Sequence, residues 1–252
     1  MANERFAEFI EQDPKSFVQG LFEESSTQKQ RLGTIRKLSD GREFVYAQMG
    51  AANAVAGAVY QGVAPVVANH ANMAVTANAA VGAREVSITM GDSTLANTAN
   101  ALAEGFLWVN TGAGNGCAYK IKSHAAIAAN ANGNIALYDK VRIALTAATS
   151  KVSVMQHPCK AVIIHPSPPT GAIVGVAPQV ITANYFAWLQ RRGPCAVEVE
   201  GTVVNGDSVI CSETVDGTVG PGANGASEEE YPVGVCIANS ANDHWALIDL
   251  KL

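Results

Sequence analysis

Apolar and polar residues alternate along residues 181–211 in a pattern that predicts three strands joined by two turns. Phe186 and Trp188 lead into Gly193-Pro194, and apolar residues then recur at every second position until Asn205-Gly206, which precedes another apolar run. Alternation indicates a sheet with one buried and one solvated face. Asn-Gly favours a two-residue hairpin because both central residues need positive φ.

The same order of features occurs along residues 106–138. Phe106 and Trp108 are followed by a glycine and then by Cys117, and Asn132-Gly133 precedes the next apolar run. Repetition of this kind predicts an internal module, although coincidence in a chain rich in alanine and glycine is the alternative. The module makes Trp108, Trp188 and Phe186 candidate core anchors, with Cys117 and Cys195 behind the two tryptophans.

Similar patterns extend to the rest of the chain beyond residue 30. Residues 32–50 predict two strands across Asp40-Gly41, residues 82–92 predict one strand, and residues 233–252 predict two closing strands. We therefore expect a mainly β fold of repeated antiparallel modules, arranged as a sandwich or a barrel-like sheet.

A division into domains follows from changes in composition. We expect an N-terminal arm over 1–30, a first β domain over 31–165 and a second over 166–252. The boundary between the β domains falls in the proline- and glycine-rich tract 165–179. One compact unit over both is the alternative.

Residues 1–30 differ in kind from the rest of the chain. Apolar side chains recur at helical spacing, and Asp13-Pro14 can begin a second short helix, so we expect a short helical arm followed by a polar linker. These apolar residues must bury against the chain's own domain or against a neighbouring subunit. On the second hypothesis, the candidate intersubunit or capsid contacts are Phe6, Phe9, Phe17, Leu21 and Phe22.

Composition narrows the classes of partner. Only 15% of the 252 residues are charged, against about 25% in an ordinary soluble domain. Such a surface suits a protein that contacts other protein subunits, although a neutral β protein without that role has the same composition. If the repeated modules only support the fold, we expect the residues that bind a partner in the arm, in the small-residue tract 51–83 and in the loop 217–231.

Charge and hydropathy weigh against other partners. The net charge of −5 offers no basic surface, so we expect no binding to nucleic acid. The longest uncharged stretch is broken by asparagine, proline and glycine, so we expect no membrane span. Acidic residues near the N-terminus stand where a secretory signal would be positive, which predicts folding in a cytoplasm.

Sequence motifs for catalysis are few. The five cysteines are odd in number and lack CxxC spacing, which predicts buried thiols, and neither phosphate-binding glycine loops nor HExxH zinc signatures occur. The spacing of His157, Cys159 and His165 fits no common zinc site, and each histidine precedes a proline. We expect no enzymatic activity, cofactor or metal. A thiol enzyme built on Cys159 or Cys195 is the alternative.

Two acid–base pairs can be assembled from sequence alone. They are His124 with Asp139 and His244 with Asp243. Nothing in their spacing singles them out as catalytic.

The order of these segments resembles that of head decoration, or cement, proteins of tailed bacteriophages. The resemblance rests on LGTIRKLSDGREFVYAQMG, FLWVNTGAG, ITANYFAWLQRRGPCAVEVEGTVVNGDSVI and VGVCIANSANDHWALIDL, and it covers most of the chain beyond residue 30. It implies a homotrimer that binds the major capsid protein on the outside of an assembled shell and bridges neighbouring capsomers. The protein would then belong to the virion exterior after folding in the host cytoplasm.

Other virion components remain alternatives to this interpretation. A tail tube, spike or minor head protein is similarly β-rich and lacks an active site. A major capsid protein is disfavoured, because the sequence predicts no long charged helix between residues 31 and 252.

Overall fold

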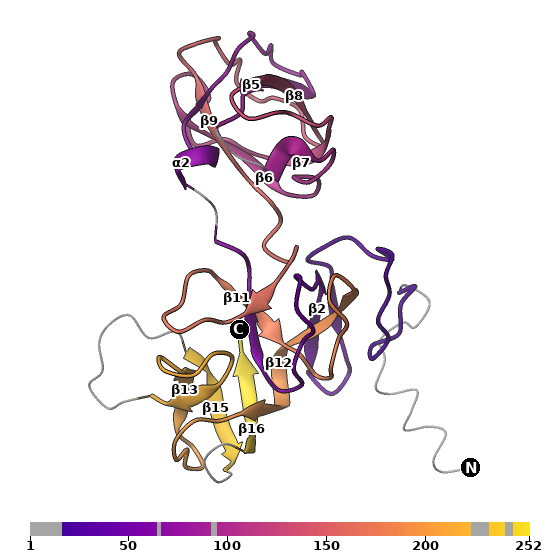
Figure 1. Ribbon diagram of the computed structural model, residues 1–252, viewed down its shortest axis with the longest axis vertical. Coiled ribbons are helices and arrows are strands. Elements are labelled where there is room, and N and C mark those ends of the chain that lie inside the picture. Colours follow the sequence, from indigo (N-terminus) through magenta and orange to yellow (C-terminus); the bar gives the residue numbers. More distant parts are fainter. Residues whose placement is uncertain (1–16, 65–66, 92–94, 223–231, 240–243) are drawn as a thin grey trace. The chain divides into compact units, whose positions relative to one another are not determined.

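The computed structural model describes residues 17–64, 67–91, 95–222, 232–239 and 244–252 (Figure 1). The fold is mainly β, with 43% of residues in strands and 2% in helix, and its antiparallel sheets take half-barrel and near-barrel forms. The predicted β class is therefore confirmed. Within these residues, no helix is long and apolar enough to cross a membrane.

The chain divides into two compact units, the second inserted into the first. Unit 1 comprises residues 1–63 and 158–252, and unit 2 comprises residues 64–157. This division differs from the predicted boundary at 165–179. That tract stays inside unit 1 because β10, just before it, and β11, within it, both pair with the same strand, β3.

Unit 2 is a six-stranded antiparallel sheet with strand order β4-β9-β6-β7-β8-β5. A backbone bridge between Val75 and Ile88 links the segment after β4 to β5, which nearly closes the sheet around one apolar core. Its elements are α2 (Val67–His70), β4 (Met73–Ala74), β5 (Glu85–Thr89), η1 (Leu95–Asn97), β6 (Phe106–Thr111), β7 (Ala118–His124), β8 (Asn132–Leu137) and β9 (Lys151–Met155).

Unit 1 contains the ten-stranded sheet. Its strands are β1 (Ile35–Lys37), β2 (Glu43–Gln48), β3 (Val59–Gln61), β10 (Ile163–Ile164), β11 (Ile173–Val176), β12 (Phe186–Glu198), β13 (Ser208–Cys211), β14 (Val219–Pro221), β15 (Pro232–Ala238) and β16 (Trp245–Lys251). The predicted hairpin at Asp40-Gly41 joins β1 to β2, with Gly41 at φ 89°.

Strand β12 connects the two apolar cores of unit 1 (Figure 1). Its first half pairs with β2 and carries Phe186 and Trp188 into one core, where Trp188 is 1% exposed. Its second half pairs with β16 and carries Cys195 and Val197 into the other core. Both cores therefore depend on one 13-residue strand.

The segments 106–138 and 181–211 do not share one structure. Gly112 lies in the turn between β6 and β7, whereas Gly193-Pro194 lies inside β12. Pro194 pairs with Asp249 of β16 beyond the end of the β2 pairing, so its missing N–H leaves no ladder bond unmade on that side. Trp108 is half-buried, unlike Trp188, because the inward positions of β6 are its neighbours on either side.

The turn predicted at Asn132-Gly133 is also wrong. Both residues lie in β8, paired with β5. Ile127 occupies the space beside Gly133, since a methyl group at that glycine would lie 2.4 Å from Ile127 Cδ1. Packing against Ile127, and not a turn, explains the glycine.

Candidate functional site

His157, His165 and the five cysteines, all singled out from the sequence, are buried. His157 is 8% exposed and its ring lies 5.8 Å from that of Phe106. Burial, with a smaller contribution from the charge of Lys120, lowers the pKa of His157 to about 4. His165 is 1% exposed, and burial lowers its pKa as well. Both rings are therefore neutral near pH 7.

All five cysteines are buried and none forms a disulfide. Burial raises the pKa of Cys159 to about 11 and the pKa values of Cys195 and Cys211 to about 12. A thiol nucleophile reacts as its thiolate, which burial disfavours at these positions. In the described ranges, His, Cys, Asp and Glu form no group of three that could hold a metal ion.

His124 serves the backbone. Its Nε2 accepts a hydrogen bond from the N–H of Leu102 at 3.0 Å, so Nδ1 carries the proton and donates to the carbonyl of Ala125 at 2.7 Å. Asp139 accepts a hydrogen bond from the N–H of Lys120 at 2.8 Å. The pair suggested from sequence is thus engaged in fixing loops, and Asp243 of the other pair lies outside the described residues.

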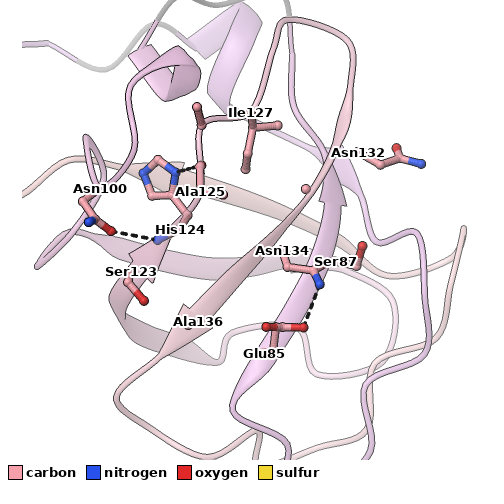
Figure 2. A pocket seen from close by; sticks show the side chains of 12 residues that line it. Glu85, Ser87, Asn100, Ser123, His124, Ala125, Ile127, Asn132, Asn134 and Ala136 are labelled. Atoms are coloured by element: carbon pink, nitrogen blue, oxygen red, sulfur yellow. Dashed lines mark hydrogen bonds between the residues drawn. The ribbon is translucent and has the colours of Figure 1, made fainter.

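A hollow of about 700 Å³ lies on the outer face of unit 2, over β5 and β8 (Figure 2). Small polar side chains line it, among them Ser87, Asn100 and Ser123. Glu85 accepts a hydrogen bond from Asn134 at 2.8 Å across the two strands. The hollow offers hydroxyl, amide and carboxylate groups to a polar ligand, but its one histidine, His124, is already held by the backbone.

The N-terminal segment packs on its own unit. Residues 17–30 form turns and no helix, so the predicted helical arm is wrong over the part that the structure describes. The ring of Phe17 lies 5.4 Å from that of Trp188, edge to face, and Leu21 packs on the same core. These two residues are therefore internal contacts. Phe22 is 57% exposed.

Phe6 and Phe9 lie outside the described residues, as do residues 223–231 of the loop 217–231. Their roles stay predictions.

The side chain of Gln19 holds this segment in place through hydrogen bonds. The sequence did not predict this role. The side chain is 1% exposed, donates to the carbonyls of Glu23 and Phe186 at 2.7 and 2.9 Å, and accepts from the Tyr46 hydroxyl at 2.7 Å. The backbone carbonyl of Gln19 accepts a hydrogen bond from Arg36, whose guanidinium lies 4.9 Å from the centre of the Phe17 ring. A lone glutamine between apolar residues gives no sequence signal of this role.

An apolar surface on unit 1 is the clearest exposed feature. Trp245 is 51% exposed, Leu247 39% and Ile237 44%, and these side chains project from adjacent strands, β16 and β15. Ala196 of β12, also exposed, lies directly beside Leu247. We call these four residues the β16 face. Alternation along 245–251 signals it in the sequence, since Trp245 and Leu247 share the side of the strand that carries Asp249 and Lys251.

Local packing sets the angle of Trp245. Its indole N–H donates to the carbonyl of Ala56 at 3.3 Å, and the ring lies against Gly57, where a methyl group would come within 2.1 Å of Nε1. Half of this ring is nevertheless left open to solvent. A fixed, exposed tryptophan is typical of a protein–protein contact.

No family model, curated protein or solved structure matches the chain.

Proposed function

We propose that this protein is a structural component of a phage virion that binds the outside of an assembled capsid and bridges neighbouring capsomers. The exposed Phe22 of the N-terminal segment carries the proposal, because apolar surface left open to solvent suits contact with other protein subunits. The major capsid protein is the proposed partner, and the virion exterior the proposed location. Self-association as a homotrimer, which the resemblance implies, is part of the same proposal.

Bridging needs only modest affinity at each site. A subunit that binds the assembled shell and not its separated parts shifts the equilibrium toward the shell by mass action. When many subunits bind one shell, contacts of a few kcal/mol each add up to a large stabilisation.

The N-terminal segment is the proposed contact with the shell. Phe22 leaves 57% of its surface open, and Phe6 and Phe9 precede it in the sequence. Phe17 and Leu21 pack in part on the core of unit 1, which leaves less of their surface for a partner. We therefore propose that residues 1–16 together with Phe22 make most of the contact.

Deletion of residues 1–16 tests this assignment. Removing residues 17–28 as well would also take away the Gln19 contacts, which would confuse binding with folding. Empty shells of the same virion, sedimented after mixing with the purified protein, should carry the intact chain and lose the truncated one. Phe22→Ser should weaken binding, whereas Ile143→Ser, at a 50% exposed position of unit 2 outside the candidate binding segments, should leave it unchanged.

Two results would contradict the proposal. Shells that bind the truncated and intact proteins equally would remove the N-terminal contact. A purified protein that polymerises alone into rings or tubes, and leaves shells bare, would favour a tail tube component.

A further inference from the structure

The β16 face carries opposite charges at its two ends. In the register between β12 and β16, Glu198 lies beside Trp245 at one end and Arg192 lies beside Lys251 at the other. These charged residues share the outward side of the sheet with the apolar ones, since inward positions alternate with them. Among the described residues, no ion pair engages Glu198, Arg192 or Lys251.

This arrangement is complementary to itself. A two-fold axis that lies in the plane of contact, perpendicular to the strands, reverses the strand direction of the second copy. Glu198 of one copy then faces Arg192 of the second copy, and Lys251 of one copy faces the Trp245 ring of the second. Each ion pair and each cation–π contact forms twice.

We infer that two copies of this chain pair face to face through the β16 face. The apolar side chains of Leu247, Ile237 and Ala196 meet at the centre, with the charged contacts around them. This pairing goes beyond shell binding and does not depend on it. It is also separate from a three-fold contact, which would use other surfaces.

The size of the face sets the strength of the pairing. Three strands about 4.8 Å apart and seven residues long, at about 3.4 Å per residue, cover about 340 Å² per copy. Stable complexes bury about 800 Å² per partner, so pairing should be weak in solution. When copies are already held side by side on a surface, their high effective concentration increases the fraction that is paired.

Asp249 opposes the pairing. Its half-buried side chain lies on the same face, beside Pro194 of β12 and Val235 of β15. Pairing removes water from this carboxylate without giving it a facing cation. Asp249→Asn should therefore strengthen pairing, by several-fold in the dissociation constant.

Sedimentation velocity tests the inference on the full chain, from about 10 µM to about 1 mM, where a contact of this area associates. The expected result is a reversible doubling of the mass of whichever oligomer is present at low concentration. Leu247→Lys should abolish the doubling. Ile143→Lys, at a 50% exposed position of unit 2, is the matched control and should not change it.

A charge exchange gives the decisive comparison. Glu198→Arg and Arg192→Glu should each weaken pairing by about tenfold or more, and the combined exchange should restore it toward the original strength. Absence of doubling at the highest concentration would overturn the inference, as would a combined exchange no stronger than either single change. Doubling that Leu247→Lys leaves intact would place the contact on another surface and equally overturn it.

Discussion

Replacing Gln19 with leucine should destabilise unit 1, because this amide serves several buried polar groups at once. Leucine has a similar volume, so the substitution removes the hydrogen bonds with little change in packing. The Tyr46 side chain is 0% exposed, and its hydroxyl donates to Gln19 while accepting from the N–H of Lys29 at 3.0 Å. After the change, the hydroxyl proton has no acceptor.

The expected loss is about 3 kcal/mol in the free energy of unfolding. A buried donor left without an acceptor costs about 1–3 kcal/mol, and each lost hydrogen bond contributes about 1 kcal/mol net. The carbonyl of Phe186 still accepts from the N–H of Ser25 at 3.0 Å, and the carbonyl of Glu23 lies in an exposed turn where water replaces the amide. The Tyr46 hydroxyl therefore dominates the sum.

Urea unfolding followed by tryptophan fluorescence measures this loss. A Trp108→Phe background leaves Trp188 and Trp245, both in unit 1, as the only reporters. Gln28→Leu is the matched control, because Gln28 is exposed and its side chain donates to the carbonyl of Gln30, two residues away, at 2.9 Å. The control should change stability by less than about 0.5 kcal/mol.

A double-mutant cycle identifies the cause. Tyr46→Phe removes the stranded hydroxyl, so its combination with Gln19→Leu should lose about 1–2 kcal/mol less than the sum of the single changes. Strictly additive losses, or a Gln19→Leu variant as stable as the control, would refute the reasoning.

Three further outcomes follow from the packing of the two units. Gly133→Ala should destabilise unit 2 by about 1–3 kcal/mol through its clash with Ile127, and should have no such effect on an Ile127→Ala background; thermal unfolding measures both. Burial keeps His157 neutral in the fold, so the unfolded chain takes up the proton first. Stability should fall by up to about 3 kcal/mol as pH drops from about 6.5 to about 4, and His157→Gln should flatten that slope in melts across this range. A chromogenic disulfide reagent should label no cysteine of the native chain within minutes and all five in urea, and rapid labelling of Cys159 or Cys195 would revive the thiol-enzyme alternative.

Local patterns predicted several strands whose alternation agrees with the face that they bury. The hairpin at Asp40-Gly41 formed as expected, because the turn residues and the alternation on either side agree. The strand over 82–92 has Val86 and Ile88 fully buried, as its alternation indicates, and the closing strands lie where predicted. At these positions one short segment contains both the turn signal and the face to be buried.

Turns predicted from glycine or proline were wrong where the position of that residue is explained by packing or strand pairing with distant residues. Gly133 makes room for Ile127, and Pro194 lies where β12 has lost its neighbour on one side. The helical arm predicted around Phe17 was wrong for a related reason. Phe17 belongs to a set of apolar residues at helical spacing. Its position is nevertheless determined by a T-shaped contact with Trp188, 171 residues away in the sequence. Periodicity reports which residues are apolar and not which partner they meet.

The insertion of unit 2 follows from a close approach that no local pattern reveals. Gln61 at the end of β3 pairs with Ile163 of β10, and a methyl group at Gly62 would lie 2.8 Å from the carbonyl oxygen of Pro158. The chain thus leaves unit 1 and returns to it at nearly the same point. The inserted unit 2 therefore adds little strain to unit 1. Each unit then keeps its own core and its own exposed surface.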